Sequence, residues 1–175
     1  MDFFATLPKL NTSDKPIEIN DLNNLYVGFV QRKYKNVFDK TSKYLPISFL
    51  ETRNINGEIS GKYLKIREQS FKSNLFRLKW DVHLTGISKE MSFLLEDRTK
   101  VSTNPRMLYS KIDKNYIFKK DILSSTCKVY VEESNINCAE IKVEKFPTSL
   151  KISLDTDDLT VIELLGIYYI IQLVY

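Results

Sequence analysis

The sequence predicts a mainly β protein with α+β character, a closed antiparallel β-barrel around a buried hydrophobic C-terminal helix. Nine or ten short strand-like stretches recur at roughly even spacing, and one long apolar segment follows them. Closure of the sheet removes its exposed edges, and the alternate residues that face inward can enclose an apolar rod. The alternative is an open antiparallel sheet with the helix on one face, whose other side a partner would cover.

The apolar C-terminal segment predicts a helix over about residues 157–174. Several of its residues are also good strand formers, but its length favours a helix. Thr160 and Glu163 share one side and Gln172 points nearly the opposite way, so the helix is apolar almost all round and must be buried in protein or in lipid. A bilayer span needs about 20 apolar residues. This run is shorter and carries a charge near its start, so we favour the protein core over a membrane tail anchor.

Glu163 is the one carboxylate between Leu159 and Tyr175, in the apolar part of this helix. A buried carboxylate must either pair with a cation or keep its proton. Two positions are therefore open: the mouth of the barrel near water, or the interior with an Arg or Lys partner from a strand. We favour the mouth.

Residues 1–20 lack sustained periodicity and contain Pro8 and Pro16, so we expect an irregular N-terminal arm with a short helical turn at residues 3–7. Residues 21–175 are expected to form a single domain. The first residues, MDFFATLPKL, have neither a basic region nor a long apolar region, so they do not resemble a secretory signal. A cytoplasmic location follows as the expectation.

The first strands are expected between residues 25 and 68. Residues 25–34 contain Gly28, which indicates a bulge or a close approach of the backbone. A strand at residues 47–53 follows. The pair Asn56-Gly57 then predicts a tight hairpin turn. The turn leads into a strand at residues 62–68.

The later strands alternate apolar and polar residues. In residues 74–82, Phe76 is expected to point inward with every second residue after it. Six further strands are expected, at residues 88–96, 107–112, 116–119, 128–132, 137–144 and 149–154.

The two cysteines, Cys127 and Cys138, lie in one predicted hairpin whose turn falls near Ser134 and Asn135. If the two strands pair regularly from this turn, Cys138 lies opposite a residue near Val131 rather than opposite Cys127. Two reduced, buried thiols are therefore favoured over a disulfide.

The positive charge is concentrated in one third of the chain. The whole chain carries a formal net charge of +4, whereas residues 21–80 contain twelve Lys or Arg against five Asp or Glu. Such an excess is either a solvated face or a patch for an anionic partner. If an anion-binding or lipid-binding face exists, it is expected to be lined by Arg32, Lys33, Lys35, Arg77 and Lys79.

Catalytic and metal-binding motifs are absent from the sequence. It contains no GxSxG, HExxH, CxxC or GxxxxGK[ST] pattern, and the sole histidine, His83, has no evident orienting partner. Asp155, Asp157 and Asp158 lack the spacing of an EF-hand loop and are better explained as helix-capping residues. We therefore expect no enzyme activity, no cofactor and no metal site. Nucleic acid is not an expected partner, because the aromatic residues alternate inward.

Three local stretches carry a resemblance to a known family. GFVQRKY at residues 28–34, KYLKI at residues 62–66 and the strand from residue 76 to residue 80 are similar to strands of the tubby C-terminal-like superfamily. That superfamily includes LURP-one-related proteins, phospholipid scramblases and small bacterial members. The resemblance implies a closed antiparallel barrel of about twelve strands around a hydrophobic C-terminal helix.

These observations favour a non-enzymatic cytoplasmic binding domain that associates peripherally with anionic phospholipid through a basic face. The first alternative is a protein-interaction or immunity-type module that binds an acidic protein. The second is a tail-anchored membrane protein. The oligomeric state is not predicted.

Overall fold

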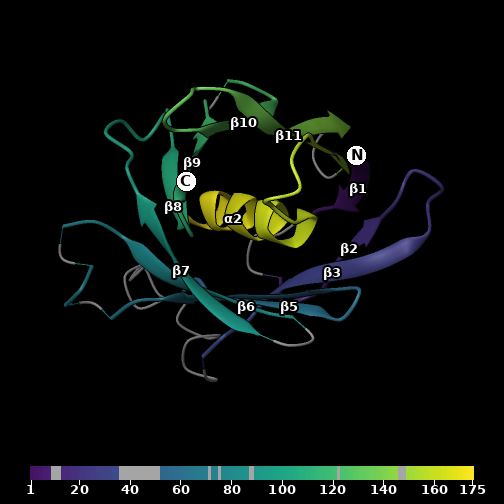
Figure 1. The fold of residues 1–175 in the computed structure, drawn as a ribbon, viewed down its shortest axis with the longest axis horizontal. Coiled ribbons are helices and arrows are strands. Elements are labelled where there is room, and N and C mark those ends of the chain that lie inside the picture. Colours follow the sequence, from purple (N-terminus) through teal and green to yellow (C-terminus); the bar gives the residue numbers. More distant parts are fainter. Residues whose placement is uncertain are drawn as a thin grey trace.

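In the computed structural model, the described residues are 1–8, 13–35, 52–70, 72–74, 76–86, 89–121, 123–145 and 149–175. They form twelve strands and one helix, labelled in Figure 1. The strands are β1 Asp2–Thr6, β2 Ile17–Asn20, β3 Tyr26–Arg32, β4 Ile55–Ile59, β5 Lys62–Glu68, β6 Lys79–Thr85, β7 Glu90–Asp97, β8 Arg106–Lys111, β9 Lys114–Lys120, β10 Thr126–Val131, β11 Asn137–Lys145 and β12 Ser149–Leu154. The helix is α2, Val161–Val174.

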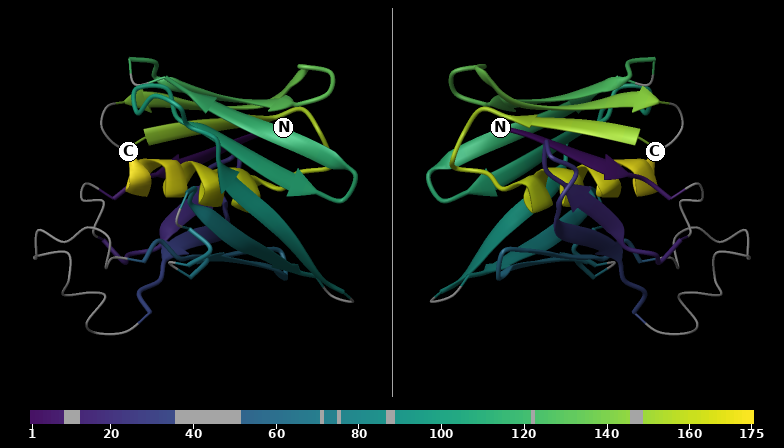
Figure 2. Two further views of the ribbon diagram at one scale, coloured as in Figure 1. Left: turned by 90° about the vertical axis from the view of Figure 1, so that its left-hand side faces the viewer. Right: turned by 90° about the vertical axis from the view of Figure 1, so that its right-hand side faces the viewer.

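Each strand pairs antiparallel with the strands before and after it, and β1 pairs with β12 to close the barrel. The helix α2 lies inside the barrel, as Figure 1 shows from one end and Figure 2 from the sides. The predicted fold class is confirmed.

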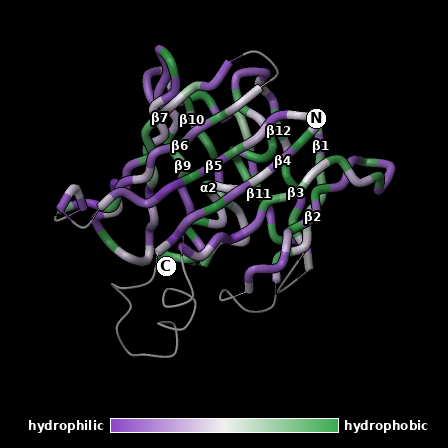
Figure 3. The backbone as a smooth tube through the Cα atoms, turned by 90° about the horizontal axis from the view of Figure 1, so that it is seen from below, coloured by the Kyte–Doolittle hydropathy of each residue, from purple (hydrophilic) through white to green (hydrophobic). Residues whose placement is uncertain are grey.

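The barrel interior is filled by the alternate residues of each strand together with the helix. In β6, Trp80, Val82 and Leu84 are buried while the residues between them are more exposed. Figure 3 shows hydrophobic and hydrophilic residues following one another along the wall. Every residue of α2 from Val161 to Ile171 is buried, because the wall surrounds the helix on all sides. This explains a helix with no polar stripe.

The helix α2 has 14 residues and is therefore about 21 Å long. Among the described residues, no helix combines the length and the apolar character needed to cross a membrane. The apolar segment is buried inside the barrel, so the tail-anchor alternative is not supported.

The N-terminal region differs from the expected irregular arm with a helical turn. Residues 2–6 form β1 and residues 17–20 form β2, and β1 is the strand that completes the barrel. In β1, Phe3 and Ala5 face the interior, and in β2, Ile17 and Ile19 do so. Two inward residues per strand are too few to give a periodic signal.

The expected hairpin turn at Asn56-Gly57 is wrong. Both residues lie inside β4, and the turn is at Ser60-Gly61, where both φ angles are positive, +47° and +74°. Gly57 is suited to the strand because an added Cβ would lie 3.1 Å from the carbonyl oxygen of Phe29. Gly57 is therefore explained by close packing between strands and not by a turn.

The strand expected at residues 74–82 begins later, at Lys79. Asn74 explains the shift, since its side-chain oxygen accepts a hydrogen bond from the Lys79 N–H at 3.0 Å and its amide donates to Gln69 O at 3.2 Å. Phe76, expected to face inward, lies in this connection and is 97% exposed.

The bounds of the other expected strands agree more closely with the structure. Those at residues 62–68 and 149–154 are confirmed to the residue, and the bounds of the five strands between residues 88 and 145 are confirmed within two residues. Most of the strand expected at residues 47–53 lies outside the described residues. The close approach expected at Gly28 is confirmed, since a Cβ there would lie 2.2 Å from Glu58 O.

Both cysteines are free and buried, as expected. Cys127 lies opposite Ile141 in the register of β10 and β11, and the Cys138 thiol lies 3.5 Å from Val129 O.

Candidate anion-binding end of the barrel

The connections between strands alternate between the two ends of the barrel, because successive strands are antiparallel. We call the end where α2 finishes the C-mouth and the end where α2 begins the N-mouth. At the C-mouth lie the described parts of the connections 7–16, 33–54, 69–78, 98–105 and 121–125. Those at the N-mouth are residues 21–25, 60–61, 86–89, 112–113, 132–136 and 155–160.

Charge is sharply divided between the two mouths. The described parts of the C-mouth connections contain Lys15, Lys33, Lys35, Arg53, Lys72, Arg77, Arg98 and Lys100, against the acidic residues Asp14 and Asp121. The described parts of the N-mouth connections contain Asp21, Asp113, Glu132, Glu133, Asp155, Asp157 and Asp158, against the basic residue Lys89. This division complements the helix dipole, whose negative end lies at the C-mouth and whose positive end lies at the N-mouth.

All five residues expected to bind anions lie at or beside the C-mouth. Arg32, however, faces the interior and is 2% exposed, because the inward positions of β3 are 28, 30 and 32. Its guanidinium lies 4.6 Å above the Tyr34 ring and donates to Thr52 O at 3.4 Å. Arg32 therefore does not lie on an outer face. Lys33 and Lys35 follow the end of β3 and are exposed.

Arg77 and Lys79 lie three strands further around the wall, about 14 Å from the end of β3. The Arg77 side chain is 50% exposed and lies 3.7 Å from a carboxylate oxygen of Glu96, and Lys79 is partly buried opposite Glu96. Glu96 also pairs with Arg98 at 2.9 Å. One carboxylate thus holds two arginines at the rim without neutralising both.

Sequence reasoning missed Lys72, Arg98 and Lys100 as members of this group. Arg98 and Lys100 lie outside the basic third of the chain, and only the alternation of connections brings them to the same mouth.

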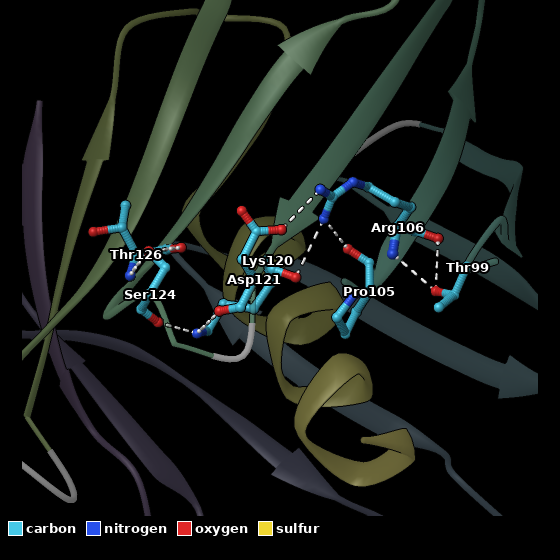
Figure 4. A network of polar contacts seen from close by, with 7 residues as sticks. All are labelled: Thr99, Pro105, Arg106, Lys120, Asp121, Ser124 and Thr126. Atoms are coloured by element: carbon cyan, nitrogen blue, oxygen red, sulfur yellow. Dashed lines mark hydrogen bonds and ion pairs between the residues drawn. The ribbon is translucent and has the colours of Figure 1, made fainter. Parts of the chain in front are cut away.

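Two neighbouring C-mouth connections are tied together by Arg106 at the start of β8 (Figure 4). Its guanidinium donates to Pro105 O at 2.8 Å, to Lys120 O at 3.2 Å and to a carboxylate oxygen of Asp121 at 2.8 Å. Its backbone N–H donates to the Thr99 hydroxyl at 2.8 Å. These bonds fix residues 98–105 against residues 121–125.

A small cavity of about 140 Å³ lies where α2 ends, lined by Ser102, Pro105, Lys120, Ile171, Gln172 and Tyr175. The Lys120 ammonium donates to the backbone oxygens of Asp121 and Ser124, so its hydrogen-bonding capacity is largely used. The carbonyls at the end of a helix also disfavour an anion. Anions are therefore better placed on the outer rim of the C-mouth than in its centre.

At the N-mouth, Glu163 is fully buried and paired with Lys111 of β8, which corrects the favoured position near water. The Lys111 ammonium donates to its two carboxylate oxygens at 2.8 and 3.0 Å, and Tyr109 OH donates at 2.6 Å. Burial and the charge of Glu163 raise the pKa of the Tyr109 hydroxyl.

Thr160 completes this network as the cap of α2. Its backbone N–H and its hydroxyl both donate to Glu163 Oε2 at 2.8 Å, and its hydroxyl accepts from the Glu163 N–H at 3.4 Å. This is a capping box, and the T-x-x-E spacing in the sequence could have predicted it. The polar atoms of Glu163 are all engaged, so the group anchors the helix.

His83 lies on the wall, with Nδ1 2.9 Å from the Ser92 hydroxyl and 4.0 Å from Glu90. Within the described part of the chain, no group of three or more His, Cys, Asp or Glu side chains could hold a metal ion.

A family model described as the Tubby C-terminal like domain matches residues 3–175. No curated protein and no solved structure matches the chain significantly.

Proposed function

The chain belongs to the tubby C-terminal-like domain family, and from this premise we propose that it is a non-enzymatic binding domain for anionic phospholipid surfaces. It would act in the cytoplasm, peripherally at the membrane, with the C-mouth as its contact surface. The observation that carries the proposal is the division of charge between the mouths.

The geometry of the basic side chains suits an extended anionic surface. They come from connections spread around one end of the barrel, so they are not gathered in one pocket. A juxtamembrane Lys or Arg contributes about 1 kcal/mol toward an anionic surface, and the contribution falls off within a Debye length of roughly 8–10 Å. Several such residues at one end also orient the domain, because the acidic N-mouth is repelled.

The test is co-sedimentation of the full chain with phosphatidylcholine vesicles, with and without phosphatidylserine, at low and at high salt. We expect pelleting only with the anionic vesicles, and less of it at high salt.

A charge-reversed variant sharpens this test. Lys33→Glu, Lys72→Glu and Lys100→Glu together change one exposed residue in each of three C-mouth connections. The loss of three favourable contacts, about 3 kcal/mol, weakens binding roughly a hundredfold. The matched control, Lys62→Glu with Lys65→Glu and Lys89→Glu, makes the same change in net charge at the N-mouth and in the middle of the wall, and should bind nearly as well as the original chain.

Two outcomes would overturn the proposal. Equal losses in the two variants would mean that only net charge matters. No pelleting with anionic vesicles would exclude the lipid surface and leave an acidic protein as the next candidate for the same basic residues.

A further inference from the structure

Among the described residues of the C-mouth connections, three large apolar side chains are exposed. Phe76 is 97% exposed, Val101 56% and Leu123 99%. They come from the β5–β6, β7–β8 and β9–β10 connections, which follow one another around the C-mouth. Two strands separate successive connections, so neighbouring connections leave the wall about 10 Å apart along an arc.

Basic residues flank two of these side chains directly. Arg77 follows Phe76, and Lys100 precedes Val101. At a membrane surface, a polypeptide commonly places apolar side chains in the boundary between headgroups and acyl chains while its cations meet the phosphates. The C-mouth presents this combination.

Two of the connections that carry the apolar side chains, β7–β8 and β9–β10, are held in shape before any contact is made. Arg106 bonds residues 98–105 to residues 121–125, as seen in Figure 4. Within them, the Asn104 N–H donates to Val101 O at 2.8 Å, and the Ser124 N–H donates to Asp121 O at 2.9 Å. A surface that is already ordered loses less conformational entropy on binding.

The N-mouth shows that exposed apolar residues alone do not decide which end of the barrel meets the membrane. Leu22, Leu25 and Ile112 are 66%, 62% and 75% exposed there. Acidic residues surround them, with Asp21 beside Leu22 and Asp113 beside Ile112. An anionic bilayer would be repelled from that end, so charge selects the C-mouth.

We infer that Phe76, Val101 and Leu123 insert into the headgroup boundary of an anionic bilayer, so that the barrel stands end-on with α2 pointing its C-terminus at the membrane. This inference rests on the proposed function and adds to it the apolar contact and the orientation. Arg106 is then a positioning residue, because it holds two of the inserting connections.

The orientation can be read with an environment-sensitive fluorophore on single surface cysteines. Cys127 and Cys138 are 0% and 6% exposed, so a new surface thiol can be labelled selectively. The three variants are Phe76→Cys and Leu123→Cys at the C-mouth and, as the matched control, Ile112→Cys at the N-mouth. With phosphatidylserine-containing vesicles we expect a blue shift of the emission at positions 76 and 123 and none at position 112.

A binding measurement complements the fluorescence. Phe76→Ser with Leu123→Ser removes two inserting side chains and leaves the basic residues in place. Vesicle binding should weaken roughly tenfold to a hundredfold, and the binding that remains should depend more steeply on salt. Leu22→Ser with Ile112→Ser is the control and should change binding little.

The outcomes separate this inference from the proposal on which it rests. Pelleting with anionic vesicles but no shift at positions 76 and 123 would overturn insertion and leave the lipid-binding function standing. A shift at position 112 would overturn the orientation. No pelleting and no shift would overturn both.

Discussion

The two mouths of the barrel use the same residue types in opposite ways. At the N-mouth, Lys111 and Glu163 are 8% and 0% exposed, and their charges are directed inward to fix the start of α2. At the C-mouth, the Arg77 and Arg98 side chains are 50% and 47% exposed and share Glu96 at the rim. The difference teaches that burial, more than sequence, decides whether a charged pair supports the fold or remains available to a partner.

The largest effect is expected from Lys111→Met, which leaves Glu163 buried without its cation. Removing one partner of a buried ion pair lowers the free energy of unfolding by about 3–5 kcal/mol. Urea denaturation measures this loss. Adding Glu163→Gln removes the uncompensated charge and should restore part of the lost free energy of unfolding. A loss below about 1 kcal/mol for Lys111→Met would mean that the N-mouth pair is not an anchor.

The corresponding cation at the other end of α2 is Arg53. Its guanidinium lies 3.3 Å from Glu68 Oε1 and donates to Leu173 O, near the end of the helix, at 3.4 Å. Both contacts are longer than those of Lys111, and Glu68 keeps some contact with water, so Arg53→Met should cost about 1–2 kcal/mol in the same measurement. A cost equal to that of Lys111→Met would remove the contrast between the two mouths.

A smaller effect is expected in acid at the N-mouth rim. The hydrogen bond from Lys114 lowers the pKa of the Asp158 carboxyl below its usual 3.8, and Tyr116 OH adds a bond at 3.3 Å. A lowered pKa favours the native state above pH 3.8, and this contribution is lost as the pH falls through the native pKa. NMR titration of Asp158 should show the pKa returning toward 3.8 in Lys114→Met. An unchanged value would exclude Lys114 as its cause.

The smallest effect concerns the two thiols, one toward each mouth. Burial raises the pKa of Cys127 to about 12, and burial also raises the pKa of Cys138. Both thiols should therefore react slowly with iodoacetamide at pH 8, and Cys127, with no exposed surface, more slowly than Cys138 at 6%. Mass spectrometry of the native protein measures both rates. Faster reaction at Cys127 would mean that the C-mouth opens more readily.

The sequence alone predicted the helix and most of the strands that form the wall. An apolar segment without a polar stripe has to be enclosed, and alternating residues such as those around Trp80 predicted the inward face of β6. The residue pattern predicted nine or ten strands, whereas the resemblance to the family implied about twelve. β1 and β2 were missed because each offers two inward residues, and because their pairing depends on β12 and β3 rather than on local pattern.

The candidate site was harder to predict, because it depends on which end of the barrel each connection occupies. In an antiparallel barrel, a connection's end is set by whether an even or an odd number of strands precedes it. Missing β1 and β2 leaves that number odd or even as before, but the basic residues were sought in one window of the chain and not end by end around the barrel. A window of residues 21–80 therefore detected the basic excess but not its partners Arg98 and Lys100. Glu163 was misplaced for a related reason, since its partner Lys111 is 52 residues away in the chain.

The pairing of β1 with β12 also has a consequence for how the protein is made. A ribosome releases the N-terminal strand first, and its partner, residues 149–154, emerges only after ten other strands. Until then β1 has an open edge, and the lumen lacks α2, which follows β12 in the chain. Contacts between residues far apart in the chain slow folding and prolong the exposure of aggregation-prone edges. The barrel should therefore complete its folding only after β12 and α2 have left the ribosome, in one late step that joins β1 to β12 and encloses the helix.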